Sequence, residues 1–407
     1  MDILLPNDQQ LAWSSIVQDL LACHPLPPFH STTIRFIDEV SRTILLSKSH
    51  RRFPELLSMA HWMRGFHLQE IKQNFETKRN NRILVPRGLV LHFAPSNVDS
   101  IFMYSWFVSL LVGNKNMIRL SRNRTEQMTL LLTILNNVLI KDEFSELRKR
   151  VVIISYEHND TITRELSSLC DVRVIWGGDE TIRQIRSIPL PPNATELCFT
   201  GKFSICAIHA ATILDSTDED LNQLVQKFMN DAFWFDQLAC SSPKLVIWIG
   251  EQDQTVKAKA RFWNLVKNRL DTTTLHWGSE VGITRMITGY SYALQGLGDQ
   301  LSTSKTDLPY RVHITSLTNE IREKHCGGGL FLEMELPSLF KLIPLLTRKD
   351  QTLAVFGFDR EELRSFATQL GGYGIDRIVE VGHSLDFQLT WDGYDLLLYL
   401  TREITIE

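Results

Sequence analysis

Two patterns of hydrophobic and polar positions follow one another along the chain. Between residues 8 and 78, apolar side chains recur at helical spacing. One face of the first segment comprises Leu11, Ile16, Leu20 and Leu21. We therefore expect an N-terminal helical layer. From Ile83 onwards, short apolar runs alternate with longer amphipathic segments, which is the pattern of buried strands and the helices that cover them.

The second pattern predicts a β-α-β-α order of elements. Strands that alternate with helices form a mostly parallel sheet with both faces covered, and such a sheet can bind a nucleotide. The expected strands are 89–93, 117–120, 151–155 and 172–175. The expected helices are 98–111, 125–140, 161–168 and one that begins after Gly178.

Composition narrows the class of protein. The 407 residues are 43% hydrophobic and 22% charged, which is enough to fill large cores and more than one domain. A formal net charge of -4 gives no electrostatic reason to bind nucleic acid. The longest apolar run, Ile101 to Val112, is too short and interrupted to span a bilayer, and Met1 is followed by no basic signal-peptide region. We expect a soluble, cytoplasmic chain.

Six cysteines are scattered along the chain, with no C-x-x-C pair and no histidine at zinc-ligand spacing. A metal site is therefore not expected. A disulfide scaffold is not expected in so long a chain either, which favours a reducing compartment where a thiolate persists. The cysteines are Cys23, Cys170, Cys198, Cys206, Cys240 and Cys326.

Cys240 occupies a position suited to chemistry. Thr217 or Asp218 can cap a helix that runs to Ala232, and residues 245–249 have the pattern of a buried strand. Cys240 thus falls in the connection between helix and strand, and such connections carry functional groups more often than element interiors do. A free cysteine is also among the most buried residue types and often acts as a small hydrophobe. From position alone, the two interpretations have equal weight.

Two further connections lie at the carboxyl ends of predicted strands. Ser96 and Asn97 follow the first strand, where an open α/β sheet binds its ligand and where the Asn97 amide could donate a hydrogen bond. Either residue would also serve as a helix N-cap, and position alone favours the cap. Gly177 and Gly178 follow the fourth strand, where glycines let backbone N–H groups approach a phosphate. The sequence has neither a G-x-G-x-x-G fingerprint nor a Walker A motif.

Taken in order, these segments resemble the aldehyde dehydrogenase superfamily and, within it, the LuxC-type acyl-CoA reductases. Each motif alone is weak, but the match keeps a consistent order from residue 83 to residue 407. The segments that carry it are VPRGLVLHFAPSNVDS at 85–100, GNKNMIRLS at 113–121, IWGGDETIRQIR at 175–186, FDQLACSSPKLV at 235–246, and RIVEVGHSLDFQLTWDGYDLLLYLTREI at 377–404 with its signature Trp391-Asp392-Gly393.

The resemblance implies an aldehyde-dehydrogenase-like α/β fold with a Rossmann-type nucleotide-binding domain, an α/β catalytic domain and a short oligomerisation strand. Glu403 to Glu407 alternate as an edge strand that needs a partner. The family adds such a strand to a neighbouring subunit's sheet, which implies a homodimer or homotetramer. The expected domains are 1–80 (N-terminal helical layer), 81–205 (nucleotide-binding), 206–375 (catalytic, with Cys240) and 376–407 (C-terminal segment with the oligomerisation strand).

Carried over residue by residue, the resemblance makes Cys240 the nucleophile and Asn97 the oxyanion donor. The implied reaction forms an acyl-cysteine from an acyl-CoA or acyl-protein thioester, and hydride from a reduced nicotinamide then gives the aldehyde. The implied cofactor is NADPH, with NADH as the alternative, because Arg119 stands where many relatives have lysine and could contact a ribose or a 2′-phosphate. An acyl-activating ligase is an implied partner. The implied cofactor-binding residues are Ser96, Arg119, Ser121, Gly177 and Gly178.

The chain departs from the family pattern at two positions. Cys198 begins the segment CFTGK, where the family's E-L-G-G-K has its general base. Without that carboxylate, hydrolysis of an acyl-enzyme slows by roughly 10²–10⁴-fold, which favours reduction over acid formation. HCGGG at 325–329 replaces the family's E-x-F-G-P loop, so no residue is assigned to the nicotinamide ribose. The glycines could bring backbone to the cofactor or form a flexible turn before the next strand.

Alternatives stay open for both function and substrate. A reductase of another activated carboxylate, such as a small or sugar-pathway acyl thioester, would keep all these features, and a non-catalytic scaffold would tolerate loss of Cys240 and Asn97. A set of aromatic side chains forms either core or an acyl pocket. The set comprises Phe102, Tyr104, Trp106, Phe107, Phe233, Trp234 and Phe235.

Overall fold

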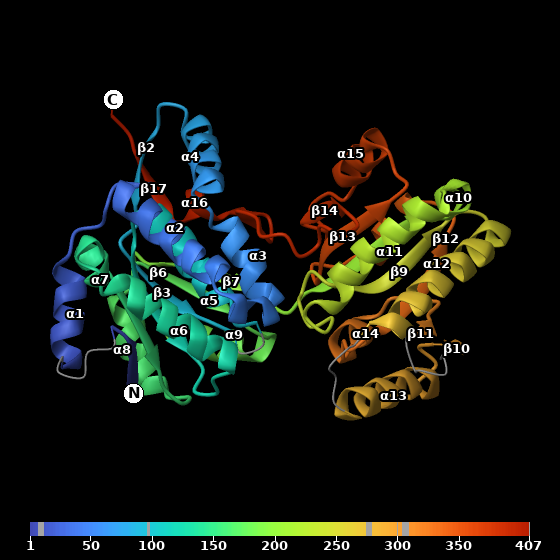
Figure 1. Ribbon diagram of the computed structural model, residues 1–407, viewed down its shortest axis with the longest axis horizontal. Coiled ribbons are helices and arrows are strands. Elements are labelled where there is room, and N and C mark those ends of the chain that lie inside the picture. The colour runs from blue at the N-terminus through green and yellow to red at the C-terminus, as the bar shows by residue number, and fades with distance from the viewer. Residues whose placement is uncertain (7–11, 96–97, 274–278, 299, 303–308, 407) are drawn as a thin grey trace. The chain divides into compact units, whose positions relative to one another are not determined.

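Two units, each built on one large sheet, make up the chain (Figure 1). The computed structural model describes residues 1–6, 12–95, 98–273, 279–298, 300–302 and 309–406. Unit 1 comprises Met1–Gly201 with Phe387–Glu407, and unit 2 comprises Lys202–Asp386. The chain therefore passes from one unit to the other twice.

The sheet of unit 1 has six strands, of which β3 to β7 run parallel. Two predicted strands, 89–93 and 151–155, match to the residue and the others to within two residues, because apolar runs bounded by turns mark buried strands well. The antiparallel edge strand β1 is not predicted, since four residues show no period. The spatial order is β1 (Asp2–Leu5), β5 (Val151–Ser155), β4 (Lys115–Leu120), β3 (Leu89–Phe93), β6 (Val172–Trp176) and β7 (Thr195–Phe199).

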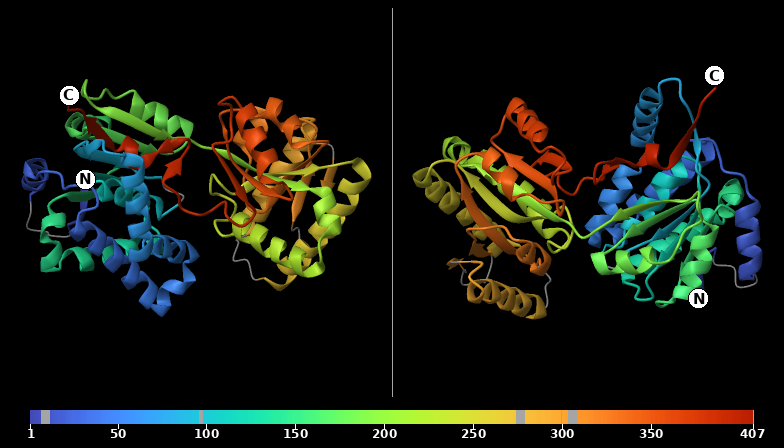
Figure 2. Two further views of the ribbon diagram at one scale, coloured as in Figure 1. Left: turned by 90° about the horizontal axis from the view of Figure 1, so that it is seen from above. Right: turned by 180° about the vertical axis from the view of Figure 1, so that it is seen from behind.

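Helices cover both faces of this sheet (Figure 2). Every residue of α5 is buried, because this helix packs on both the sheet and α2, and its sequence is accordingly apolar on all sides. The helices on this face are α5 (Ile101–Leu111), α6 (Glu126–Leu139), α2 (Ser31–Leu46), α3 (Pro54–Trp62) and α4 (Gly65–Arg79). The opposite face carries α1 (Trp13–Ala22), α8 (Asp160–Leu169) and α9 (Asp179–Arg186). The short element η1 (Lys48–Arg52) lies between α2 and α3. The short elements η2 (Asp142–Phe144) and α7 (Ser145–Arg148) lie between α6 and β5.

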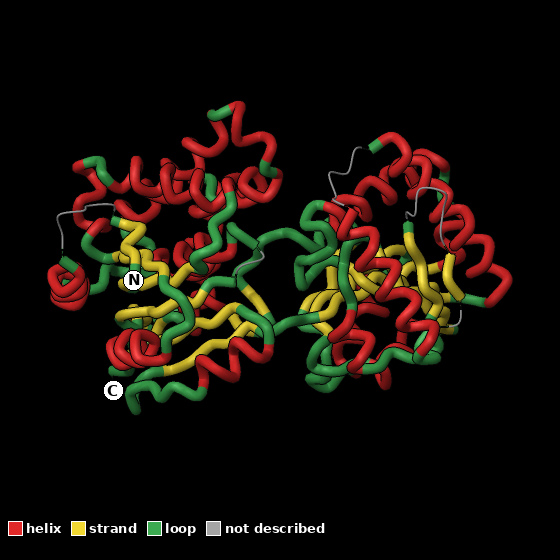
Figure 3. Tube along the Cα trace, turned by 90° about the horizontal axis from the view of Figure 1, so that it is seen from below, coloured by secondary structure: helices red, strands yellow, loops and turns green. Residues whose placement is uncertain are grey.

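Unit 2 repeats this layered arrangement on a seven-stranded sheet, with helices in red around the yellow strands in Figure 3. All its strands are parallel except β10. The spatial order is β10 (Gln300–Ser302), β11 (Tyr310–His313), β12 (Leu330–Leu336), β9 (Pro243–Ile249), β8 (Phe203–His209), β13 (Asp350–Phe356) and β14 (Arg377–Glu380). One face carries α10 (Ala210–Asp215), α11 (Asp218–Phe233) and α12 (Gln252–Thr272). The other carries α13 (Ser279–Leu294), α14 (Asn319–Lys324), η3 (Leu339–Leu345) and α15 (Arg360–Gln369).

The C-terminal strand pairs with another strand of the same chain. β17 (Thr401–Ile404) pairs antiparallel with β2 (Ile83–Pro86) in a two-stranded ribbon. The predicted strand, 403–407, thus begins two residues later than β17. The pairing with β2 ends at Ile404. Residue 407 lies outside the described residues. The elements before it are β15 (Thr390–Trp391), β16 (Tyr394–Asp395) and α16 (Leu396–Tyr399).

The aromatic set divides between the cores of the two units. Its four members on α5 are buried in the core of unit 1, where Trp391 also packs, and Phe233 is buried in unit 2. Trp234 differs, because 47% of its surface is exposed. The core interpretation therefore holds for the members on α5 and for Phe233.

Candidate active site

The sheet of unit 1 has a topological switch point at β3. From β3 the chain continues to β4 and β5 on one side, and it then returns to the other side as β6. Open α/β sheets bind nucleotides in the crevice outside the carboxyl ends of the strands at such a point. The residues that follow β3, β4 and β6 therefore form one candidate site.

Arg119 and Ser121 lie at the carboxyl end of β4. The Arg119 guanidinium donates a 3.1 Å hydrogen bond to the carbonyl oxygen of Tyr156 and lies 5.3 Å from the centre of its ring. Burial lowers the pKa of Arg119, yet an arginine keeps its charge at any physiological pH. The Ser121 hydroxyl accepts a hydrogen bond from the Asn123 N–H. A fixed cation thus stands beside β3, where a phosphate or ribose can reach it.

Gly177 and Gly178 form the turn between β6 and α9. The Gly177 N–H donates to the carbonyl oxygen of Phe199 at 3.1 Å, so β7 already uses this group. Gly178 is the N-cap of α9, and a Cβ built on it would meet no atom within 4 Å. Asp179 and Glu180 in the first turn oppose an approaching anion. The open side of this turn is therefore at Gly178.

Glu55 of α3 holds Ser100, the N-cap residue of α5. Ser96 and Asn97 lie outside the described residues, but the Ser100 N–H donates a 2.6 Å hydrogen bond to Glu55, and the Gln127 amide donates to the other oxygen of that carboxylate at 2.7 Å. Burial raises the pKa of Glu55. Sequence analysis misses Glu55 because an acid in the first turn of a helix is an ordinary feature.

Cys240 lies in unit 2, half-buried, in the connection between α11 and β9. The predicted cap of α11 is confirmed, since the Thr217 hydroxyl accepts from the Asp220 N–H at 3.2 Å. Before the cysteine, Asp236 and Gln237 have left-handed backbones with φ of 52° and 60°. Consecutive non-glycine residues in this conformation persist only where their surroundings hold them. Contacts of both residues with the segment before β12 hold this conformation.

Gln237 is the main anchor of the Cys240 segment. Its side chain is fully buried and donates 2.9 Å hydrogen bonds to the carbonyl oxygens of Pro243 and Leu330. Its side-chain oxygen accepts from the Gly329 N–H at 3.0 Å, and the Gly328 N–H donates to Asp236 at 2.8 Å. Hydrogen bonds thus join this segment to the first residue of β9 and to the residues at the start of β12.

The glycine run at 327–329 packs on this segment. Its three residues have φ of 70°, 63° and 80°, and a Cβ at Gly327 would lie 3.1 Å from Asp236 O and 3.2 Å from Gln237 O. Glycine is required there by both conformation and close approach. The run therefore supports the Cys240 segment, a role that sequence analysis does not consider.

Three further polar side chains form hydrogen bonds with the main chain of the Cys240 segment or of the glycine run. The Ser204 hydroxyl donates a 2.7 Å hydrogen bond to the Cys240 carbonyl oxygen, and the buried Lys244 amine donates to the Ala239 carbonyl oxygen at 3.0 Å. His325 accepts from the Gly327 N–H at Nδ1, so its Nε2 carries the proton and donates to Leu330 at 3.0 Å. Sequence analysis misses Lys244, although a lysine inside the otherwise apolar strand PKLVIWI is a visible signal.

Cys198 is half-buried in β7, in register with Ile175 of β6. Burial and the neighbouring Glu196 raise the pKa of its thiol to about 12, so the group stays protonated and is no general base at neutral pH. Among the described residues, no group of three or more His, Cys, Asp or Glu side chains could hold a metal ion. In the same part of the chain, no helix has the length and apolarity to cross a bilayer.

Comparison with known sequences gives a family match over most of the chain. The family described as acyl-CoA reductase (LuxC) matches residues 55–403. A curated relative named long-chain acyl-protein thioester reductase, from Aliivibrio fischeri, is 22% identical over 329 residues, which cover 79% of this chain and 64% of the relative. A protein of the same name from Photorhabdus laumondii is 25% identical over 327 residues, with the same coverage. The chain thus spans about 64% of the length of these relatives.

Solved structures with the same fold are aldehyde dehydrogenases. Aldehyde dehydrogenase 21 from Physcomitrella patens superposes with a TM-score of 0.69 at 10% identity, covering 96% of this chain and 89% of that one. An NAD-dependent aldehyde dehydrogenase from Sinorhizobium meliloti gives a TM-score of 0.68 at 12% identity, covering 96% and 85%. At such identity the likeness shows the fold alone, and it confirms the predicted aldehyde-dehydrogenase-like α/β fold.

Proposed function

Because the chain belongs to the acyl-CoA reductase (LuxC) family, as its motifs predict, we propose that it reduces a long-chain acyl thioester to the aldehyde, with Cys240 as nucleophile. The observation that carries this proposal is the half-buried Cys240 on a segment anchored by Gln237. A catalytic nucleophile needs such a fixed position, whereas a cysteine that only fills space does not.

The chemistry of the first half-reaction follows from the residues of this chain. The Cys240 thiolate attacks the thioester carbonyl, a carbon–sulfur bond forms, and the oxyanion is held by the Asn97 amide and a backbone N–H near Cys240. Collapse of this adduct expels the thiolate of CoA or of an acyl-carrying protein and leaves acyl-Cys240. A bound reduced nicotinamide supplies the hydride for the reduction. Cys198 provides no base to activate water, which protects the acyl-enzyme from hydrolysis.

The residues at the carboxyl edge of unit 1 fit a dinucleotide with a 2′-phosphate. In doubly wound sheets an acidic residue after the second strand binds the ribose hydroxyls of NAD, and an arginine nearby takes the phosphate of NADP. Here β4 is followed by Ser121, Arg122, Asn123 and Arg124. Together with Arg119, the exposed Arg122 supports NADPH as the cofactor, with NADH as the alternative.

The substrate class follows from the relatives' names and from the Cys240 segment. Long-chain acyl-protein thioester reductases act on apolar acyl groups, and two large apolar side chains before Cys240, Trp234 and Leu238, are 47% and 50% exposed. We assign these two side chains to contact with the acyl chain. The donor is acyl-CoA or an acyl-protein thioester, and an acyl-activating ligase is the corresponding partner.

The ribbon of β2 and β17 supports a homodimer or homotetramer. Two strands alone are marginally stable in water, and in the described residues the ribbon pairs with no third strand. Addition to the sheet of a second copy would satisfy its open edge. Sedimentation of the purified chain tests this: a monomer at micromolar concentration contradicts it.

Turnover with acyl-CoA thioesters of several chain lengths and NADPH tests the proposed activity. Loss of NADPH absorbance with matching formation of aldehyde, fastest for long chains, is expected. No turnover with any thioester favours the non-catalytic scaffold. Fastest turnover with short or sugar-pathway thioesters favours the alternative substrate class, and oxidation of aldehyde to acid at a comparable rate contradicts the argument from Cys198.

A further inference from the structure

Lys244 is a buried cation in the middle of the unit 2 sheet. It is the second residue of β9, whose neighbours are β8 and β12, and only 8% of its surface is exposed. Its amine donates to the carbonyl oxygen of Ala239, the residue directly before Cys240. An ammonium group removed from water is costly unless an opposite charge or several hydrogen bonds compensate it.

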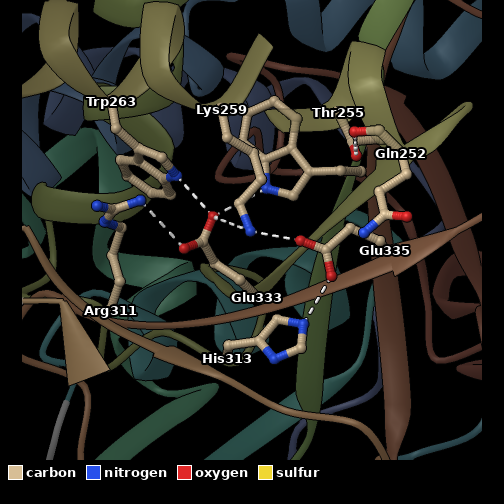
Figure 4. A network of polar contacts seen from close by, with 9 residues as sticks. Gln252, Thr255, Lys259, Trp263, Arg311, His313, Glu333 and Glu335 are labelled. Atoms are coloured by element: carbon tan, nitrogen blue, oxygen red, sulfur yellow. Dashed lines mark hydrogen bonds and ion pairs between the residues drawn. The ribbon is translucent and has the colours of Figure 1, made fainter. Parts of the chain in front are cut away.

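Two other buried charges in unit 2, Arg322 and Glu333, have ion-pair partners. Arg322 lies 2.8 Å from Asp350, and both are almost fully buried. On β12, Glu333 accepts a hydrogen bond from the Trp263 indole and forms an ion pair with Arg311, as Figure 4 shows. It also accepts a hydrogen bond from the Trp248 indole. Arg322 and Glu333 are thus compensated by opposite charges, whereas the buried Asp231 is compensated by hydrogen bonds from Gly382 and Ser384.

Lys259 belongs to the same network and differs from Lys244 in having a carboxylate partner. Lys259 pairs with Glu335, and His313 contacts the same carboxylate at 2.6 Å (Figure 4). Lys244 has no such partner: in the described part of the chain, no carboxylate lies within ion-pair distance of it. A buried lysine without a carboxylate needs several hydrogen bonds or another anion to compensate its charge.

Cys240 is the nearby group whose negative charge, when its thiol ionises, acts on Lys244. Burial lowers the pKa of Lys244 to about 8, and the charge of Cys240 acts in the opposite direction. The other titratable group that interacts with Lys244 is His325, whose pKa is lowered to about 3 by burial and by Lys244 itself. His325 is therefore neutral, and Ser204 and Gln237, which bond the same segment, carry no charge.

We propose that Lys244 is a positioning residue that holds Cys240 as a thiolate, with its buried ammonium as the counter-ion of the sulfur and its hydrogen bond to Ala239 as the mechanical link. The inference deepens the proposed function and rests on it, because it concerns the state of the proposed nucleophile before substrate arrives. A cation beside a thiol favours the thiolate, which is the reactive form. The neutral His325, with both ring nitrogens hydrogen-bonded, takes no proton from the thiol.

The test is the pH dependence of Cys240 alkylation by iodoacetamide, measured by mass spectrometry of the Cys240 peptide. In the unmodified enzyme we expect the midpoint below the ordinary thiol pKa of about 8.5. Lys244→Met should raise the midpoint by about one to three pH units, and Lys244→Arg, which keeps the charge, should restore most of the shift. Lys259→Met is the matched control, a second partly enclosed lysine of the same unit, and should leave the midpoint unchanged.

Two results would overturn the inference. One is a midpoint in the unmodified enzyme at or above about 8.5, which decides the question even if the Lys244 variants fail to fold. The other is a folded Lys244→Met with an unchanged midpoint. Alkylation needs neither thioester nor cofactor, so an enzyme without acyl-CoA turnover but with a Lys244-dependent midpoint would contradict the proposed function and leave this inference intact.

Discussion

The side-chain amide of Gln237 donates a 2.9 Å hydrogen bond to the carbonyl oxygen of Leu330, which ties the segment before Cys240 to the first residue of β12. Because Gln237 also bonds Pro243 and Gly329, one side chain connects three stretches of main chain. The position of Cys240 therefore depends on contacts between residues about ninety positions apart in the sequence.

Replacing Gln237 should destabilise the protein and loosen Cys240. Gln237→Ala removes three hydrogen bonds of a fully buried side chain and leaves their main-chain partners unsatisfied, so we expect the free energy of unfolding to fall by about 2–4 kcal/mol. Urea unfolding measures this. Gln223→Ala, at an exposed position of α11, is the control and should change it by less than about 0.5 kcal/mol. Equal effects of the two substitutions would contradict the anchoring role.

The glycine run can be tested by two matched substitutions. Gly327 and Gly371 both have left-handed backbones, with φ of 70° and 58°. An alanine Cβ would lie 3.0 Å from Leu238 at the first position and no closer than 3.9 Å to any atom at the second. Gly371→Ala should cost about 1–2 kcal/mol through backbone strain alone, and Gly327→Ala should cost more and also slow Cys240 alkylation. The same loss of stability at both positions would show that close packing at Gly327 has no effect beyond backbone strain.

Cofactor preference should depend on Arg122, which follows β4. Arg122 forms an exposed 2.8 Å ion pair with Glu157 and is free to exchange this partner for a phosphate, since exposed ion pairs are weak. Arg122→Ala should raise KM for NADPH about tenfold or more, the value of one charge-assisted hydrogen bond, with little change for NADH. Arg124→Ala, which lies 3.9 Å from Asp2, is the control. An equal rise in KM for both cofactors at Arg122 would speak against a 2′-phosphate site.

Stability should depend on pH through Asp231 of α11. This buried carboxylate accepts hydrogen bonds from Gly382 and Ser384, and burial raises its pKa to about 6 from 3.8. The folded chain therefore holds this proton more tightly than the unfolded chain, so the contribution to stability is complete below pH 3.8 and is lost as the pH rises through about 6.

Asp231→Asn checks this sign. The free energy of unfolding of the unmodified protein, compared between pH 4 and pH 7, should contain a fall of about 1–3 kcal/mol that is absent from the variant. The difference in the free energy of unfolding between the two proteins should therefore change between pH 4 and pH 7. A constant difference would show that Asp231 does not titrate in this range.

Local pattern predicts much of the fold and only part of the site. The strands at 89–93 and 151–155 and the Thr217 cap are set by neighbours in sequence, so periodicity and capping rules find them. Gln237 and the glycine run act through contacts between segments far apart in the sequence. Their residue types give no local signal of those contacts, which is why the sequence indicates Cys240 but not the groups around it.

The central claim is that Cys240 carries the acyl group and delivers it to reduction. The most direct measurement is the mass of the Cys240 peptide after the enzyme is mixed with a long-chain acyl-CoA without cofactor, and again after NADPH is added. The account predicts one acyl group on Cys240, lost on addition of NADPH with one equivalent of aldehyde. An unmodified Cys240, an acyl group on another cysteine, or release as free acid at the same rate with and without NADPH would contradict it.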